Sequence, residues 1–340
     1  MAEAFLRLSA ADRIDALGVA ADRLGRPAHL LEKDVWVVWA IQQLFGSSIG
    51  ANLVFKGGTS LSKAYHVIDR FSEDVDLTFD IRALIPDLIE GREDAMPASS
   101  SEERRWSKRV RQALPEWVAG TIQPILQNAI EREGIEAKLR IDGDKLFIDY
   151  ENLAQGTGYV SPSVMLEFGA RSTGEPASPR DIVCDAAGAV EGVAFPFARP
   201  RVMHAERTFW EKATAIHVFC LQSRMRGDRF SRHWHDVARL DAAGIAAVAI
   251  EDRVLGAAVA RHKTMFFAEK AADSSWIDYG AATSGHLQLV PSGEALGVLA
   301  EDYRRMIEDG LLATAPEPFD TLMERCADIA NRANAAFRAK

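Results

Sequence analysis

The chain has 340 residues, of which 48% are hydrophobic and 26% are charged, the balance of an ordinary globular protein. This length allows two domains, or one domain with a substantial lobe. The net charge of −9 argues against a surface that coats nucleic acid indiscriminately, but it is compatible with local basic patches.

The cysteines and the hydrophobic segments limit the class of protein further. Cys184, Cys220 and Cys326 are odd in number, widely spaced and never in a C-x-x-C arrangement, so a disulfide framework or a zinc ribbon is not expected. The N-terminus lacks a basic segment followed by an apolar run, and no stretch reaches the roughly 18 apolar residues of a membrane span. The sequence therefore predicts a cytoplasmic protein without a membrane partner.

Periodicity along the chain predicts an α/β first part and a helical second part. In the first part, helices are expected at 9–25, 30–45, 59–68 and 106–132, strands at 52–55, 74–80 and 163–172, and a hairpin at 138–152 with Asp142-Gly143 as its turn. Residues 90–105 are polar and predict an exposed loop. Helices are expected at 203–222, 233–242, 245–262, 293–309 and 317–338. We place the domain boundary in the Pro- and Gly-rich segment 172–202, which gives domains at 1–190 and 191–340.

The expected strand "DVDLTFD" carries carboxylates on one face. Side chains alternate between the two faces of a strand, so Val75, Leu77 and Phe79 share one face, and Asp74, Asp76, Thr78 and Asp80 share the other. Simple solvent exposure is one interpretation of the second face. However, Asp is depleted in strands, and like charges on one face repel each other. A divalent cation would offset them, and magnesium usually binds through one or two carboxylates and substrate phosphates.

The turn "KGGTS" precedes that strand by one short helix. Gly57 and Gly58 let the backbone approach a ligand closely, and Thr59 and Ser60 are expected to cap the helix that follows. The N–H groups at the start of a helix suit an anion, although a plain helix cap is the alternative. Lys56 and Lys63 flank the turn and are candidates to add positive charge near a triphosphate.

The glycine turn and the D-x-D strand together resemble the signature of the DNA polymerase beta-like nucleotidyltransferases. In that signature, G-[GS] is followed after 9–13 residues by D-x-[DE], and here thirteen residues separate Ser60 from Asp74. The resemblance implies that Asp74 and Asp76 hold two divalent ions, Mg²⁺ or Mn²⁺, that bridge the phosphates of a nucleoside triphosphate. It also implies a third carboxylate on a neighbouring strand. Glu167 in "VMLEFGAR" is our candidate for this ligand, and Asp149 is the reserve.

More of the chain resembles the AbiEii/AbiGii toxin family of nucleotidyltransferases, which includes the MenT toxins. The segments that carry this resemblance run in order from about residue 28 to residue 310, and the most specific are "KGGTSL" and "RFSEDVDL". Later segments of the match include "ERTFWEKATAIH", "SRHWHDVARL" and "DYRRMIEDG". It implies an α+β fold, with a polymerase-beta-like mixed sheet flanked by helices and then a helical C-terminal lobe. It also implies the toxin half of a toxin–antitoxin or abortive-infection system, with a cognate antitoxin as partner and RNA, most plausibly the tRNA 3′ end, as acceptor.

The family's later motifs correspond to Lys212 and Asp236. The resemblance implies that Lys212 binds nucleotide phosphate, whereas the sequence alone also allows a lysine that extends from a half-buried helix. Asp236 has three possible roles: an ion pair with Arg232 or Arg239, the orientation of Lys212, or the orientation of the acceptor hydroxyl. The sequence leaves these alternatives open.

Two basic clusters are candidates for the acceptor site. The first, "RRWSKRVR", has Arg104, Arg105, Lys108, Arg109 and Arg111 around Trp106; the second has Arg224, Arg226, Arg229 and Arg232 with His233 and His235. Basic residues beside aromatic ones suit an RNA backbone and stacked bases, whereas the alternative is a solvated helix face, which the adjoining Glu102 and Glu103 favour for the first cluster. The second cluster lies between Lys212 and Asp236, so it is the better candidate for an acceptor or nucleotide groove. Zinc at His233 and His235 is not expected, because residues two apart do not face each other on a helix. Two other functions remain open: nucleotide transfer to a protein or small molecule, and a nucleotide-binding interaction module without catalysis.

Overall fold

The computed structural model describes residues 2–72, 74–154, 161–223, 229–308, 312 and 315–338. By packing, the chain forms two compact units. The first comprises Met1–Ala64, Ser72–Ala95 and Arg105–Met203, and the second comprises Tyr65–Phe71, Met96–Arg104 and His204–Lys340. The boundary between residues 190 and 191 stays a prediction. None of the helices in the described ranges is long and apolar enough to cross a membrane.

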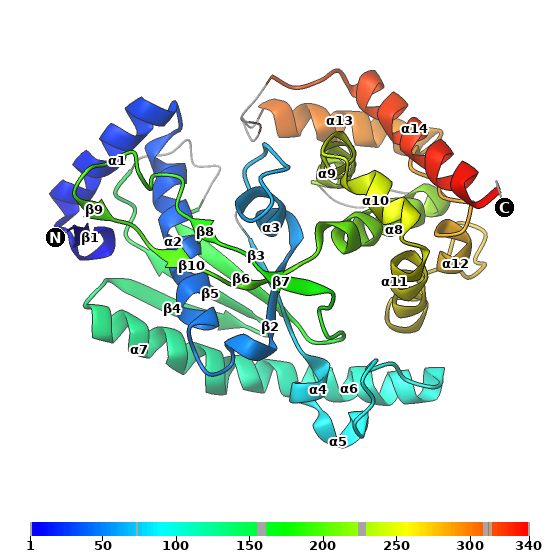
Figure 1. The fold of residues 1–340 in the computed structure, drawn as a ribbon, viewed down its shortest axis with the longest axis horizontal. Coiled ribbons are helices and arrows are strands. Elements are labelled where there is room, and N and C mark those ends of the chain that lie inside the picture. Colours follow the sequence, from blue (N-terminus) through cyan, green and yellow to red (C-terminus); the bar gives the residue numbers. More distant parts are fainter. Residues whose placement is uncertain are drawn as a thin grey trace. The chain divides into compact units, whose positions relative to one another are not determined.

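The first unit contains, within the described residues, a seven-stranded mixed sheet (Figure 1). From edge to edge its strands are β4 (Ala137–Asp142), β5 (Lys145–Tyr150), β6 (Ser163–Gly169), β3 (Val75–Phe79), β2 (Leu53–Lys56), β11 (Arg201–Met203) and β7 (Ala177–Pro179). The pairs β3–β6 and β2–β11 are parallel, and the other neighbours are antiparallel. Two further strand pairs are β1 (Glu3–Ala4) with β9 (Val193–Ala194), and β8 (Ile182–Val183) with β10 (Phe197–Ala198). The mixed sheet and its helices confirm the expected α+β fold.

The first two helices of the first unit lie close to the positions that the sequence predicts. The helices of this unit are α1 (Ala10–Leu24), α2 (Ala28–Phe45), α3 (Gly57–Lys63), α4 (Ile81–Leu84), α5 (Pro86–Ile89), α6 (Ser100–Trp117, whose first residues belong to the second unit) and α7 (Gln123–Glu133), with short 3-10 turns at Phe5–Arg7 and Gly50–Asn52. Ser9 caps α1 by accepting a hydrogen bond from the Asp12 N–H. Helix α2 runs along the sheet (Figure 1) and is buried on most sides, because its sequence is apolar almost throughout.

Three predictions about local structure in the first unit were wrong in detail. Helix α6 starts at Ser100, inside the expected loop, because the Ser99 hydroxyl accepts a hydrogen bond from the Glu102 N–H. A π turn, Val118–Ile122, joins α6 to α7. The hairpin closes at the pair Asp142–Lys145, so its two turn residues are Gly143 and Asp144. Helix α3 ends at Lys63 instead of near Ile68, and His66 follows with φ 55°, which is incompatible with a continuing helix.

The second unit is helical, as expected (Figure 1). Its helices are α8 (Ala205–Gln222), α9 (Ser231–Ala242), α10 (Ile245–Glu251), α11 (Arg253–Phe266), α12 (Tyr279–Ala282), α13 (Glu294–Glu308) and α14 (Phe319–Arg338). The single helix expected at 245–262 is two helices, because the Asp252 carboxylate accepts the Leu255 N–H and starts a new helix there.

Candidate active site

Strand β3 has the two faces that its sequence predicts. Val75 and Leu77 are fully buried, and Asp76 lies on the other face and is half-buried. Asp74 directly precedes the strand. Asp80, at the far end, caps α4 by accepting the Arg82 N–H at 2.8 Å, and it also pairs with the Arg82 guanidinium. Asp80 is therefore engaged locally, and Asp74 and Asp76 are the candidate metal ligands of this strand.

The glycine turn lies directly against the Asp76 carboxylate. Gly57 has φ +78°, a conformation that side chains rarely adopt, and it joins β2 to α3 without a loop. A Cβ atom at Gly57 would lie 1.9 Å from Asp76 Oδ2, far inside van der Waals contact. Lys56 lies opposite Asp76 in the register of the antiparallel strands β2 and β3. The structure thus brings together the two halves of the sequence signature, since glycine alone leaves room for that carboxylate.

The Thr59 and Ser60 side chains stabilise this turn through hydrogen bonds but do not cap the helix. The helix begins at Gly57, so both residues lie in its first turn, and the expected capping role is wrong. The Ser60 hydroxyl donates to the Gly57 carbonyl at 2.9 Å, and the Thr59 hydroxyl contacts the Asp74 carbonyl and the Ser72 hydroxyl. Both side chains are buried. They fix the position of the glycine turn relative to the start of β3.

Glu167 is the carboxylate that sheet register places beside Asp76. The parallel pair β3–β6 aligns Asp76 with Glu167 on adjacent strands. Asp149 pairs with Ser163, four residues before Glu167, which is about 13 Å away along the strand. Asp149 also accepts from Arg140 at 3.3 Å. Register therefore favours Glu167 over the reserve candidate.

The three carboxylates are not gathered into a complete metal cluster. Glu167 forms an ion pair with Lys145 at 3.3 Å, and no group of three or more His, Cys, Asp or Glu side chains in metal-holding positions occurs among the described residues. Asp76 against the glycine turn, with Asp74 two residues away, still matches the one or two carboxylates that magnesium takes alongside phosphates. The donor set fits magnesium at Asp74 and Asp76.

The Lys63 side chain, which flanks the glycine turn in the sequence, is held in ion pairs. Its buried ammonium pairs with Asp34 at 2.6 Å and with Asp185 at 2.7 Å, and Arg26 also pairs with Asp185. Burial lowers the pKa of Lys63, but the two carboxylates outweigh it, so the pKa is raised and the group stays charged. Its charge is balanced inside the first unit, and its expected contribution near a triphosphate stays a prediction.

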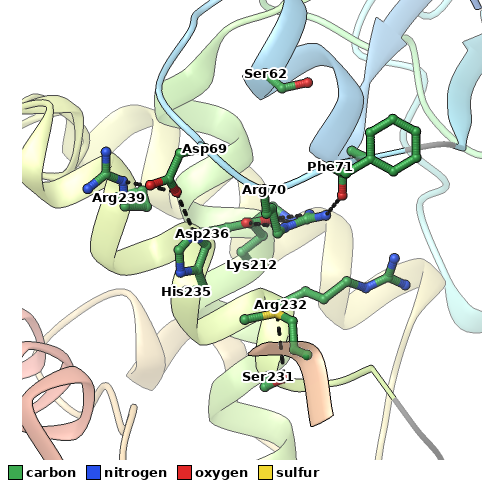
Figure 2. A network of polar contacts seen from close by, with 12 residues as sticks. Ser62, Asp69, Arg70, Phe71, Lys212, Ser231, Arg232, His235, Asp236 and Arg239 are labelled. Atoms are coloured by element: carbon green, nitrogen blue, oxygen red, sulfur yellow. Dashed lines mark hydrogen bonds and ion pairs between the residues drawn. The ribbon is translucent and has the colours of Figure 1, made fainter. Parts of the chain in front are cut away.

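The second unit has its own charged cluster, formed by Lys212, Asp236 and Arg70 (Figure 2). Lys212 lies on α8 beside the apolar stripe, and its Nζ is 2.9 Å from Asp236 Oδ2. Arg70 contacts both oxygens of Asp236, at 2.7 and 2.8 Å. Burial alone would raise the pKa of Asp236, but Arg70 and Lys212 hold that pKa well below its usual range. Of the roles left open for Asp236, the contact with Lys212 is present, and Arg70 is an additional partner.

The histidines of α9 are bound into the same unit. His235 Nε2 is 3.0 Å from Asp69 Oδ1, and Arg239 Nε is 3.7 Å from the same oxygen (Figure 2). His233 is half-buried, its ring 5.9 Å from that of Phe219, and desolvation of the imidazole lowers its pKa to about 3. Both rings therefore take part in packing and pairing within α9 and its neighbours.

Asp302 positions α9, and sequence reasoning did not single it out. Its two carboxylate oxygens accept the backbone N–H groups of Arg229 at 2.6 Å and Ser231 at 2.7 Å, at the start of the helix that carries Asp236. Asp302 is buried, and its place in the family-like segment "DYRRMIEDG" was the signal that the sequence offered.

The basic clusters differ from the expected basic-and-aromatic surfaces. Trp106 is fully buried, with the Arg92 guanidinium 4.8 Å above its ring, so it does not offer a stacking surface. The cationic side chains of that cluster are exposed along α6; they are Arg104, Arg105, Lys108, Arg109 and Arg111. In the second cluster, Arg224 and Arg226 lie outside the described residues. Arg232 Nε donates to the Arg229 carbonyl at 3.1 Å.

A mixed sheet with a glycine turn against the D-x-D pair is the arrangement that the resemblance to nucleotidyltransferases implies. The family model described as "Nucleotidyl transferase AbiEii toxin, Type IV TA system" matches residues 40–325. The chain belongs to this family of toxin nucleotidyltransferases. The match confirms the resemblance seen in the sequence, and the protein is therefore an enzyme.

Comparisons with individual proteins give more distant matches. The nucleotidyltransferase toxin MenT4 from Mycobacterium tuberculosis H37Rv is 18% identical with a TM-score of 0.49, and the alignment covers 98% of this chain and 90% of that one. The protein JHP933 from Helicobacter pylori is 14% identical with a TM-score of 0.40, and the alignment covers 91% of each chain. No curated protein matches the sequence.

Proposed function

We propose that the enzyme transfers a nucleoside monophosphate from a nucleoside triphosphate to an RNA acceptor, the 3′ end of tRNA, as the toxin of a toxin–antitoxin or abortive-infection system. The observation that carries this proposal is the Asp76 carboxylate against the Gly57 turn, with Glu167 in register beside it. A cation at the carboxylates and a phosphate at the turn would then be neighbours.

Magnesium, or manganese in its place, fits the carboxylates of Asp74 and Asp76. When bound, such an ion neutralises charge on the α-phosphate and on the leaving pyrophosphate. The chain's own residues position the reactants: backbone N–H groups of Gly57 and Gly58 face the phosphates, and Lys56 adds positive charge beside the turn. Lys212 binds a phosphate group of the nucleotide through its ammonium. The acceptor oxygen bonds to the α-phosphorus as the bond to the pyrophosphate breaks, and the hydroxyl proton leaves to solvent.

The RNA acceptor is supported by the exposed cations of α6 in an otherwise acidic chain. Arg104, Lys108 and Arg111 follow one another at helical spacing, so they lie on one face and can neutralise successive backbone phosphates. An antitoxin partner is supported by the family, whose members belong to type IV toxin–antitoxin systems.

The test is transfer of labelled nucleotide by the purified enzyme with magnesium. Each of the four α-labelled triphosphates is offered with total RNA, with a protein lysate and with a panel of aminoglycosides, and labelled RNA is sequenced at its 3′ end. We expect label on tRNA and a loss of roughly 100-fold or more in Asp76→Asn, since one metal ligand contributes several kcal/mol to the transition state.

Asp80→Asn is the matched control, because Asp80 directly follows the same strand but pairs with Arg82. It should keep transfer at temperatures at which it remains folded. Undiminished transfer by Asp76→Asn would refute the assigned site. Label only in the protein or aminoglycoside arm would overturn the RNA acceptor, and nucleotide binding without product in any arm would overturn the transfer reaction.

A further inference from the structure

The second unit contains a buried carboxylate held by two cations, and one of these cations has no role in the function proposed above. The Asp236 side chain is 0% exposed, that of Arg70 is 4% exposed and that of Lys212 is 11% exposed. Arg70 Nε donates to Asp236 Oδ1 and Arg70 Nη2 to Oδ2, while Lys212 approaches the same Oδ2. Figure 2 shows both cations meeting at this one carboxylate.

The charges of this cluster do not cancel. Arg70 and Lys212 contribute two positive charges, and both contact the single negative charge of Asp236. Because Arg70 engages both oxygens of the carboxylate in a fork, it fixes the orientation of Asp236 and satisfies most of its negative charge. The Lys212 ammonium is then held in place by a carboxylate that it shares with Arg70.

We propose that Arg70 is a positioning residue for nucleotide binding: it holds Asp236 so that Lys212 is fixed in direction and keeps its positive charge for a phosphate group of the nucleoside triphosphate. This inference rests on the proposed function, in which Lys212 binds phosphate. Without Arg70, Lys212 and Asp236 would form a neutral pair, and an anion would have to compete with the carboxylate for the ammonium.

A purely structural Arg70 predicts a different pattern of variants. Breaking a buried pair destabilises a protein whatever else it does, so a loss of stability does not distinguish the two roles. If Arg70 acts through Lys212, its loss affects phosphate binding only while Lys212 is present. If Arg70 only supports the fold, its effect on binding adds to that of Lys212.

The test is calorimetric binding of a non-hydrolysable nucleoside triphosphate analogue to the full chain, with the thermal midpoint of each variant measured alongside. We expect Arg70→Gln to weaken binding by about 10-fold, the effect of one charge at close range. Arg70→Lys keeps the charge but loses the fork, so it should give an intermediate loss. Arg332→Gln is the matched control, because Arg332 pairs with another carboxylate of α9, Asp241 at 2.7 Å, and should bind as wild type does.

Two double variants decide the matter. In a Lys212→Ala background, Arg70→Gln should weaken binding by less than about 2-fold, because coupled residues are not additive. Arg70→Gln with Asp236→Asn removes the carboxylate that competes for Lys212, so it should bind more tightly than Arg70→Gln alone. Additive losses, or no recovery in the second double variant, would overturn the positioning role, as would a wild type that does not bind the analogue. Binding without transfer would instead overturn the proposed function and leave the role of Arg70 standing.

Discussion

Gly57 is the residue at which local geometry and the proposed chemistry meet most closely. In Gly57→Ala, the new Cβ would lie 1.9 Å from Asp76 Oδ2, so the carboxylate or the turn must move by more than 1 Å. A displacement of that size costs on the order of 100-fold in rate when it affects a reacting group. We therefore expect transfer to fall by about that factor, measured as kcat/KM with labelled nucleotide.

Gly188→Ala separates this clash from backbone strain. Gly188 has φ +81°, close to the +78° of Gly57, but nothing lies within 4 Å of the Cβ that it would gain. Both variants should lose roughly 1–3 kcal/mol of stability from the strained backbone, and only Gly57→Ala should lose activity. Equal activity in the two variants would show that the turn tolerates a displaced Asp76.

Single residues of the candidate site were predictable where a local pattern fixes their surroundings. Asp76 follows from alternation in a short strand, and Gly57 from the turn that precedes it. The ion pairs of Lys63 were not predictable, because its partners Asp34 and Asp185 are 29 and 122 residues away in the sequence and no local signal connects them. Arg70 was missed for the same reason, since Asp236 is 166 residues further along the chain.

The register between β3 and β6 distinguishes the two candidates for a third ligand of the proposed metal site. Glu167 aligns with Asp76 across a parallel pair, whereas Asp149 lies four residues away in register. Glu167→Gln should therefore weaken magnesium dependence, raising the metal concentration for half-maximal transfer by about 10-fold or more. Asp149→Asn should leave it unchanged. The reverse order of effects would exchange the two assignments.

Elements were predicted well where apolar periodicity is long, and poorly at their ends. Helix α2 and strand β3 follow directly from their patterns, whereas the ends of α3, α6 and α10 depend on single side-chain bonds or on one residue's φ. Ser99 and Asp252 start helices that periodicity alone does not separate from their surroundings. A cap is one hydrogen bond, and the sequence around it offers several residues able to form it.

The start of α9 depends on a carboxylate from α13. Asp302 accepts two backbone N–H groups, from Arg229 and Ser231, and in Asp302→Ala both donors lose this partner in a buried position. We expect a loss of about 2–4 kcal/mol in the free energy of unfolding, measured by urea denaturation. Asp252→Ala removes an exposed cap with one bond and should cost only about 1 kcal/mol. Equal costs would mean that Asp302 contributes no more than an ordinary surface cap.

At the scale of the whole molecule, the sequence predicts the α/β part and the helical part but not how the chain is shared between them. Tyr65–Phe71 and Met96–Arg104 pack with the second unit although they lie within the N-terminal half of the chain. Asp69 and Arg70 make this plain, because both pair with residues of α9. A single boundary in the sequence cannot describe two units that are each built from separate segments of the chain.

Two desolvated histidines of the second unit, His217 and His233, give the molecule a predictable acid response. Burial lowers the pKa of His217 to about 4 and that of His233 to about 3, against about 6.5 in an unfolded chain. Between these values only the unfolded state binds the proton, so stability falls as the pH drops from about 6.5 toward 4, by up to about 1.4 kcal/mol per pH unit for each histidine. Asp236 acts in a lower window, because its depressed pKa gives stability that is lost only below the ordinary carboxyl range.

His217→Gln should flatten this dependence when urea unfolding is followed by tryptophan fluorescence between pH 6.5 and 4.5. The imidazole Nδ1 accepts the Gln288 N–H at 3.1 Å, and a glutamine oxygen can accept that bond without gaining a proton. His286→Gln is the control, because His286 is exposed and should leave the slope as it is in the wild type. If both variants retained the wild-type slope, protonation of His217 would not be part of acid unfolding, and the burial of its ring would have no energetic consequence in this range.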